Sequence, residues 1–163
     1  MARKGELGSV EEALMKSTGV AIRWGGMWEE AGNLGKASEV YSKALDEVME
    51  VMASGKASRK EIMRGVAIAM KIGDLGVIMD GPEQLKTAEA MYTFCVQEMM
   101  RLKMTPAQLD KVKKEMEEGP RPKNEDGEKD ELETDLPSWA GDVQLTAGME
   151  RLGELYAKLG NIE

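Results

Sequence analysis

The chain has 163 residues, of which 22 are Lys or Arg and 30 are Asp or Glu, so its net charge is −8 at pH 7. It contains one Cys and no His, which excludes zinc fingers, His-dependent catalytic triads and an intrachain disulfide. The acidic balance disfavours a general basic surface for nucleic acid. No apolar run reaches bilayer length and the N-terminus lacks a signal peptide, so we expect a soluble, intracellular, single domain over 1–163.

Capping signals and apolar periodicity predict a first helical hairpin over 10–53. A capping-box pattern at Ser9 opens a helix over about 10–31, and Gly32 ends it. A second helix follows over about 35–53, and the short turn between them predicts antiparallel packing. The apolar residues of the first helix, mostly three or four apart, are Ala13, Leu14, Val20, Ala21, Trp24, Met27 and Trp28. The stripe of the second is Ala37, Tyr41, Ala44, Val48 and Val51.

A second hairpin is predicted over 59–103. Ser58 begins another capping box, ahead of a helix that runs to about Met79, and Pro82 is well placed to start the next helix. The stripe of that next helix is Leu85, Ala88, Tyr92, Cys95, Met99 and Leu102. Cys95 occupies a small-residue position on it, which favours structural burial over redox chemistry.

The remaining third of the chain is less regular. An extra helix is predicted over 106–118, followed by an acidic loop over 117–137. Residues 117–135 hold nine acidic and three basic residues and almost nothing apolar, so we expect this loop to be disordered. A last helix forms the half repeat 138–160, with Trp139 as a packing anchor.

An internal repeat links these helices. Gly25, Gly73 and Gly153 lie at the same phase of three helices, each between bulky neighbours. A glycine inside a helix costs about 1 kcal/mol relative to Ala, so the matched phase predicts close approach of a partner helix at each one. In the following helices, Tyr41 and Tyr92 each stand four residues after an Ala and are predicted to fill the gap between helices.

These patterns resemble the tetratricopeptide repeat (TPR) family, in which helical hairpins stack. The resemblance implies an all-α right-handed superhelix of tandem hairpins, here with about six helices. Its structural positions are Trp24, Gly25, Trp28, Gly32, Ala37, Tyr41 and Ala44 in the first unit, Gly73, Ala88 and Tyr92 in the second, and Gly153 and Tyr156 in the third. Gly76 departs from the family pattern, because an aromatic residue is expected there.

The third unit stops after its first helix. Leu152, Leu155 and Leu159 would then lack the partner that a following helix supplies. We therefore expect the chain to belong to a longer array; the alternative is that the last helix is itself a cap docked on its predecessor.

A narrower resemblance concerns the segment Leu136-Pro137-Ser138-Trp139 and the run 150–156 that follows. It is similar to the fungal mitochondrial TPR adaptors of the inner-membrane AAA protease. This would imply an upstream membrane anchor, a location facing the intermembrane space and the passing of substrates to the protease for protein quality control.

The TPR resemblance also implies a ligand groove lined by the first helix of each unit. The residues carried over to it are Ile22, Glu29, Met70, Asp74, Glu150, Arg151 and Glu154. At the positions where some TPR domains clamp acidic chaperone tails, this chain has Ile22, Gly26, Ala147 and Arg151, so only Arg151 is a cation. We therefore predict a ligand that is apolar or basic.

The resulting prediction is a protein-interaction module that acts as an adaptor or scaffold. The alternative is a structural assembly subunit with obligate contacts. We expect no enzyme, because neither a nucleophile with its base nor a phosphate-binding loop occurs. We also expect no cofactor or metal, since the acidic run 125–135 lacks the frame of a calcium-binding loop.

Overall fold

The computed structural model describes residues 4–104, six positions between 107 and 117, and 143–160, without the side chains of 4–9 and 143–144. These residues contain helices and no strand, which confirms the predicted all-α class. The helices with defined bounds are α1 (Lys4–Glu30), α2 (Leu34–Ala53), α3 (Arg59–Met79), α4 (Pro82–Lys103) and α6 (Val143–Leu159).

Some predictions fall on residues that are not described. The six described positions between 107 and 117 are helical, but most of the extra helix predicted over 106–118 lies outside the described residues. So do most of the acidic loop 117–137 and the start of the half repeat, including Trp139.

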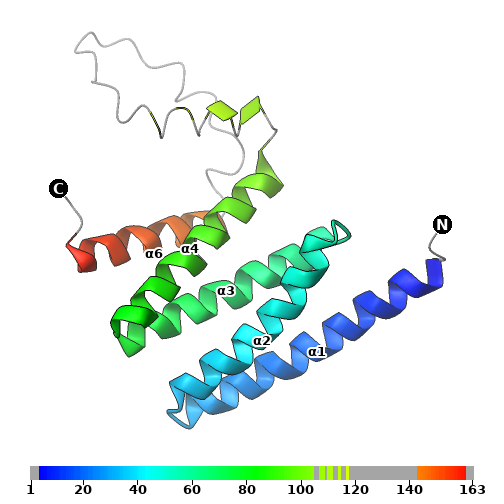
Figure 1. The fold of residues 1–163 in the computed structure, drawn as a ribbon, viewed down its shortest axis with the longest axis horizontal. Coiled ribbons are helices and arrows are strands. Elements are labelled where there is room, and N and C mark those ends of the chain that lie inside the picture. Colours follow the sequence, from blue (N-terminus) through cyan, green and yellow to red (C-terminus); the bar gives the residue numbers. More distant parts are fainter. Residues whose placement is uncertain are drawn as a thin grey trace.

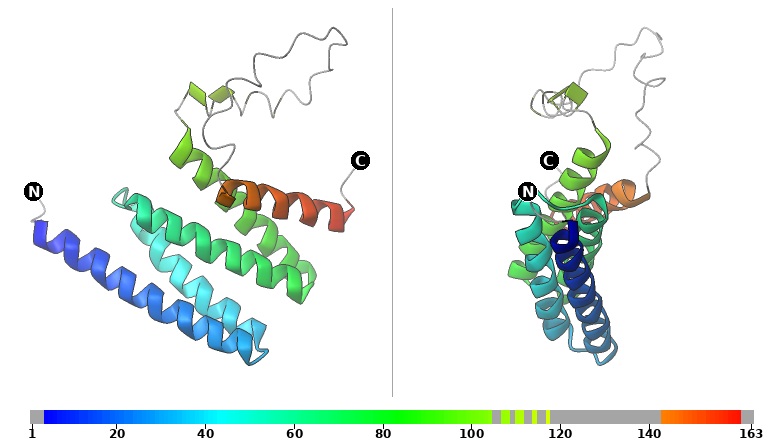
Figure 2. Two further views of the ribbon diagram at one scale, coloured as in Figure 1. Left: turned by 180° about the vertical axis from the view of Figure 1, so that it is seen from behind. Right: turned by 90° about the vertical axis from the view of Figure 1, so that its right-hand side faces the viewer.

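The helices form two layers. Each helix packs on the next in the chain, α1 on α2, α2 on α3, α3 on α4 and α4 on α6. The first layer consists of α1, α3 and α6, which run in roughly the same direction (Figure 2, left). The second layer consists of α2 and α4, seen in front in Figure 1. Among the described residues, no helix has the length and apolar character needed to cross a membrane.

The helix ends follow the capping chemistry of the sequence. At the start of α3 the Glu61 amide donates to Ser58 Oγ and the Ser58 amide donates to the Glu61 carboxylate, which confirms the predicted capping box. Asp80 ends α3 in the left-handed conformation, with φ of 57°, and Pro82 is the first residue of α4.

The predicted start of α1 is wrong. The helix begins at Lys4 and continues through Ser9, so the capping pattern there does not open it. No proline lies in this segment, and each residue added to an existing helix contributes a further backbone hydrogen bond.

The core lies between the two layers. The predicted stripes of the second layer are confirmed: their central residues are fully buried, namely Ala37, Tyr41, Ala44 and Val48 on α2 and Ala88, Tyr92, Cys95 and Met99 on α4. From the first layer, Ile68, Ile72 and Leu75 of α3 join them. Burial raises the pKa of the Cys95 thiol to about 12, as expected of a structural cysteine.

Two of the three matched glycines lie directly under tyrosine rings. A Cβ placed on Gly25 would lie 2.5 Å from the Tyr41 ring, and one placed on Gly73 would lie 2.5 Å from the Tyr92 ring. No side chain fits at either position, so each tyrosine packs against the backbone of the neighbouring helix. We call each pair a glycine–tyrosine joint.

The expected close approach is wrong at Gly153. This residue is exposed, and nothing lies within 4 Å of a Cβ placed on it. The reason is that no described helix follows α6 to supply a tyrosine. Tyr156, one turn further on, is half-buried and donates its hydroxyl to Glu89 over 2.7 Å.

Gly76 has a packing role of its own. A Cβ on Gly76 would lie 2.5 Å from the backbone oxygen of Gln84, so α3 and α4 approach closely near their turn. An aromatic residue at this position would force the two helices apart. In the first hairpin, Trp28 occupies the corresponding position, is half-buried and lies under the Lys36 ammonium at 4.4 Å from the ring centroid.

One part of the predicted stripe of α1 is not buried. Leu14 lies in the core, and Ala21 and Trp28 are half-buried against it. Val20, Trp24 and Met27 are exposed on the outer side of the helix. They point away from α2, and no other described helix covers them.

Candidate functional site

The residues predicted to line a groove all belong to first-layer helices. Ile22 and Glu29 come from α1, Met70 and Asp74 from α3, and Glu150, Arg151 and Glu154 from α6. Ile22, Glu150 and Glu154 are exposed, whereas the other four are half-buried.

Glu29 is held from two sides. It accepts a hydrogen bond from the Tyr41 hydroxyl over 2.6 Å, and Lys71 of α3 lies 2.9 Å from its other oxygen. Burial, followed by the hydrogen bond to Glu29, raises the pKa of Tyr41, so the hydroxyl stays protonated and acts as a donor. Glu29 therefore connects the first glycine–tyrosine joint to an ion pair between α1 and α3.

Asp74 repeats this arrangement one helix further along. It accepts a hydrogen bond from the Tyr92 hydroxyl over 2.7 Å, and Arg151 Nε of α6 lies 2.8 Å from the same oxygen in an ion pair. Burial and the hydrogen bond to Asp74 raise the pKa of Tyr92. Lys71 and Arg151 each stand two residues before the matched glycine of their helix, so the internal repeat extends to these cations.

These ion pairs change the predicted charge of the groove. We expected Glu29, Asp74, Glu150 and Glu154 all to repel an acidic ligand. Glu29 and Asp74 are each neutralised by a cation, so the exposed carboxylates of the set are Glu150 and Glu154. Arg151 is bound to Asp74 and is therefore not free to clamp a ligand carboxylate.

A cavity of about 380 Å³ lies between α3 and α6. Its lining consists of Asp74, Val77, Ile78, Tyr92, Arg151, Glu154, Leu155 and Lys158. Of the predicted groove residues the cavity therefore unites Asp74, Arg151 and Glu154. Ile22, Glu29, Met70 and Glu150 lie outside it.

The cavity has an apolar centre and a charged rim. Ile78 is 65% exposed beside it, and Leu155 is buried at its base. Lys158 at the rim lies 2.7 Å from Asp80 and ties the ends of α6 and α3 together. Sequence analysis missed Ile78 and Lys158. A signal for Ile78 was available in the sequence. The last turn of α3 is apolar on every side, and a helix with a single buried face does not need that many apolar residues, so one of them is left exposed.

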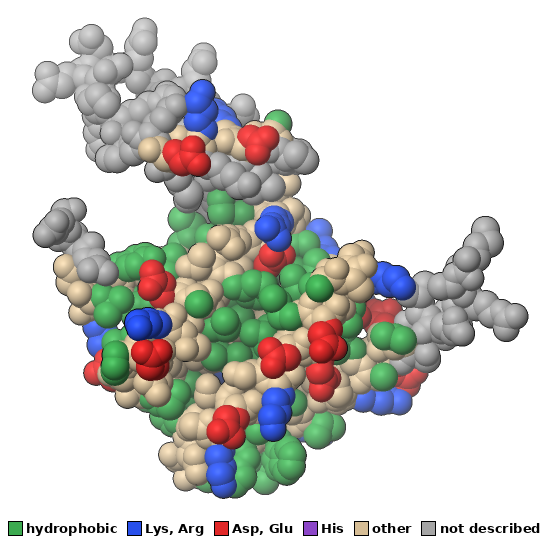
Figure 3. Space-filling view, in the orientation of Figure 1, with side chains coloured by type: hydrophobic (Ala, Val, Ile, Leu, Met, Phe, Trp, Pro, Cys, Tyr) green, Lys and Arg blue, Asp and Glu red, His purple; other side chains and the backbone are tan. Residues whose placement is uncertain are grey.

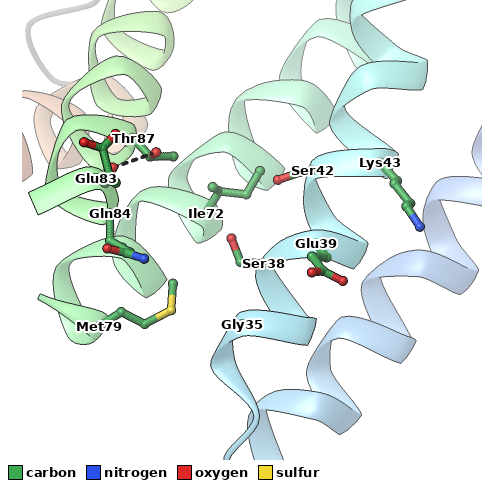
Figure 4. A pocket seen from close by; sticks show the side chains of 11 residues that line it. Gly35, Ser38, Glu39, Ser42, Lys43, Ile72, Met79, Glu83, Gln84 and Thr87 are labelled. Atoms are coloured by element: carbon green, nitrogen blue, oxygen red, sulfur yellow. Dashed lines mark hydrogen bonds between the residues drawn. The ribbon is translucent and has the colours of Figure 1, made fainter. Parts of the chain in front are cut away.

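A second depression, of about 440 Å³, lies on the opposite face between α2 and α4. Figure 3 shows apolar side chains gathered there, bordered by charged ones. In Figure 4, Ser38 and Ser42 of α2 and Gln84 of α4 surround Ile72 of α3. Thr87 donates to the Glu83 carbonyl, so its hydroxyl is occupied. None of its lining residues comes from the predicted groove.

Neither cavity holds a recognisable catalytic arrangement. The described residues contain no group of three or more His, Cys, Asp or Glu side chains that could hold a metal ion. Among them, the strongly shifted pKa values belong to the joint tyrosines and to Cys95, which have packing roles. Comparisons of the chain with protein-family models, with curated proteins and with solved structures found no match.

Proposed function

We propose that the chain is a protein-interaction module that binds a protein segment in the α3–α6 cavity. The observation that carries this proposal is the exposed side chain of Ile78 at an apolar centre that two interhelical ion pairs border. An apolar centre within a polar rim is the usual anatomy of a protein-binding surface. The two ion pairs link α6 to α3 beside the cavity.

The charges favour a basic or apolar segment. Glu154 lines the cavity, is exposed and has no ion-pair partner among the described residues. A Lys or Arg of the ligand would pair with it, while an apolar ligand side chain would cover Ile78. An acidic tail would meet Glu154 and find Arg151 already engaged with Asp74.

The finer proposal is that the stack is a TPR superhelix that serves as an adaptor or scaffold. The sequence resemblance to mitochondrial AAA-protease adaptors supports a substrate-recruiting role, with an intermembrane-space location. Both rest on the sequence patterns of the repeats.

Binding of the fluorescent 163-residue chain to an array of random dodecapeptides tests the proposal. We expect the selected peptides to combine apolar residues with Lys or Arg. Ile78→Asp should weaken their binding at least about tenfold, because it places a charge in the apolar centre. Met149→Asp, at an exposed position of α6 outside the cavity, is the matched control and should bind as wild type. Selection of acidic peptides, or equal binding by Ile78→Asp, would contradict the proposal.

A permanent assembly subunit is the second candidate function. The exposed apolar residues on the outer side of α1 favour it, because large uncovered apolar patches mark contact surfaces. Sedimentation separates the two candidates: concentration-dependent oligomers without peptide binding would favour assembly.

A further inference from the structure

The outer side of α1 carries an apolar surface that is separate from the cavity. Val20, Trp24 and Met27 are 63%, 58% and 64% exposed and lie one turn apart. We call them the outer stripe. In Figure 3, apolar side chains are visible over α1 at the lower edge of the molecule.

The internal repeat shows what covers such a stripe. When the helices are aligned on Gly25 and Gly73, the outer stripe corresponds to three residues of α3 that are at most 2% exposed because α2 packs on α3. These residues are Ile68, Ile72 and Leu75. In α6 the same positions are Gly148, Leu152 and Leu155, on the helix that packs against α4. In both cases the cover is an antiparallel second-layer helix.

Charge at the edge of the stripe follows the same repeat. The matching cations Lys71 and Arg151 each pair with a carboxylate of the preceding first-layer helix. Arg23, at the corresponding position of α1, is exposed and has no ion pair within the part of the chain that the structure describes. In the repeat this carboxylate comes from the preceding first-layer helix and not from the second-layer cover, so Arg23 does not define the charge of a helix that covers the outer stripe.

A second copy of the chain cannot supply this cover from its second-layer helices. α2 is packed between α1 and α3, and α4 between α3 and α6, so neither has a free face of the required kind. We propose that the outer stripe docks an amphipathic helix of another polypeptide, which crosses α1 antiparallel as α2 crosses α3. Its apolar face carries small and aliphatic residues.

A synthetic peptide with the sequence of residues 34–53 is the appropriate probe. It reproduces the helix that covers the equivalent stripe of α3, and it contains four acidic residues. Anisotropy of the labelled peptide, titrated with the full 163-residue chain, should show saturable binding. The double variant Val20→Asp/Met27→Asp should weaken it at least about tenfold, since two charges would be placed under the peptide.

Two controls keep the experiment decisive. Ile22→Asp adds a charge at an exposed aliphatic residue of the same helix, off the stripe, and should bind within about twofold of wild type. A scrambled peptide should not bind.

Three results would overturn the proposal. These are no saturable binding of the peptide, equal affinity for the wild type and the stripe double variant, and a dimer in sedimentation that the double variant abolishes. The last would assign the stripe to a second copy. Because the array experiment with Ile78→Asp reads a different surface, either proposal can fail without the other.

Discussion

The same substitution at two matched glycines should have opposite effects on stability. Gly73→Ala adds a methyl group 2.5 Å from one atom of the Tyr92 ring and 2.9 Å from a second. The ring cannot swing away freely, because it is buried and its hydroxyl is held by Asp74 over 2.7 Å. Overpacking of this kind costs about 1–3 kcal/mol, and a disturbed hydrogen bond adds about 1 kcal/mol.

The helix itself gains from alanine at both positions. Replacing an interior glycine by Ala stabilises a helix by about 1 kcal/mol. For Gly73→Ala this gain offsets part of the strain and of the disturbed hydrogen bond, which leaves a net loss of about 1–3 kcal/mol. At Gly153 nothing lies within 4 Å of the new methyl group, so the full gain of about 1 kcal/mol should appear. The two variants should therefore differ by about 2–4 kcal/mol in unfolding free energy.

Urea unfolding followed by circular dichroism measures both variants. The midpoint should fall for Gly73→Ala and rise for Gly153→Ala, with thermal midpoints moving by about 2–4 °C per kcal/mol. Gly19→Ala is the matched control, because nothing lies within 4 Å of its Cβ either, and it should behave like Gly153→Ala. If Gly73→Ala were as stable as wild type, the glycine–tyrosine joint would not be tightly packed and the reasoning would be wrong.

Three other substitutions test single features. Burial raises the pKa of Cys95 from 9.0 to about 12, so the thiol of the unfolded chain loses its proton at a lower pH than that of the folded chain. The unfolding free energy should therefore fall by about 1.4 kcal/mol per pH unit from pH 9 upward. In urea titrations at alkaline pH, Cys95→Ala should lack this fall, and equal pH dependence of the unfolding free energy in both proteins would contradict the assignment. Ser58→Ala removes one half of the capping box and should cost about 1 kcal/mol in the same assay, whereas a neutral result would mean that the start of α3 is held otherwise. Tyr41→Phe keeps the ring over Gly25 but removes the hydroxyl donor to Glu29, so we expect a loss of about 1 kcal/mol rather than the larger loss of an emptied joint.

Much of the helical framework could be predicted from sequence because its signals are local. A capping box, a proline at a first turn and a stripe of small and aromatic residues each act within a few residues. The bounds of α2, α3 and α4 follow from them closely. The start of α1 was not predicted correctly. The capping pattern at Ser9 marks a position where a helix can begin, but it does not show whether the helix has already begun at an earlier residue.

The candidate site was less predictable because it depends on neighbours far apart in the chain. Gly25, Gly73 and Gly153 look alike in sequence, yet only the first two meet a tyrosine, since only α1 and α3 are followed by a described helix that carries one. Likewise, the acidic character expected of the groove was partly cancelled by Lys71 and Arg151. Their pairing is a relation between helices, and no spacing along one helix encodes it.

The joints also limit how the proposed cavity can recognise a ligand. Asp74 and Arg151 form the ion pair that holds α6 to α3, and Asp74 also binds the Tyr92 hydroxyl of the second joint. A ligand that bound either residue by charge would have to break contacts of the stack, so that charge adds little net affinity. Ile78 and Glu154 line the same cavity and make no such contact. Affinity should therefore come from covering Ile78, and selectivity for a basic residue from Glu154.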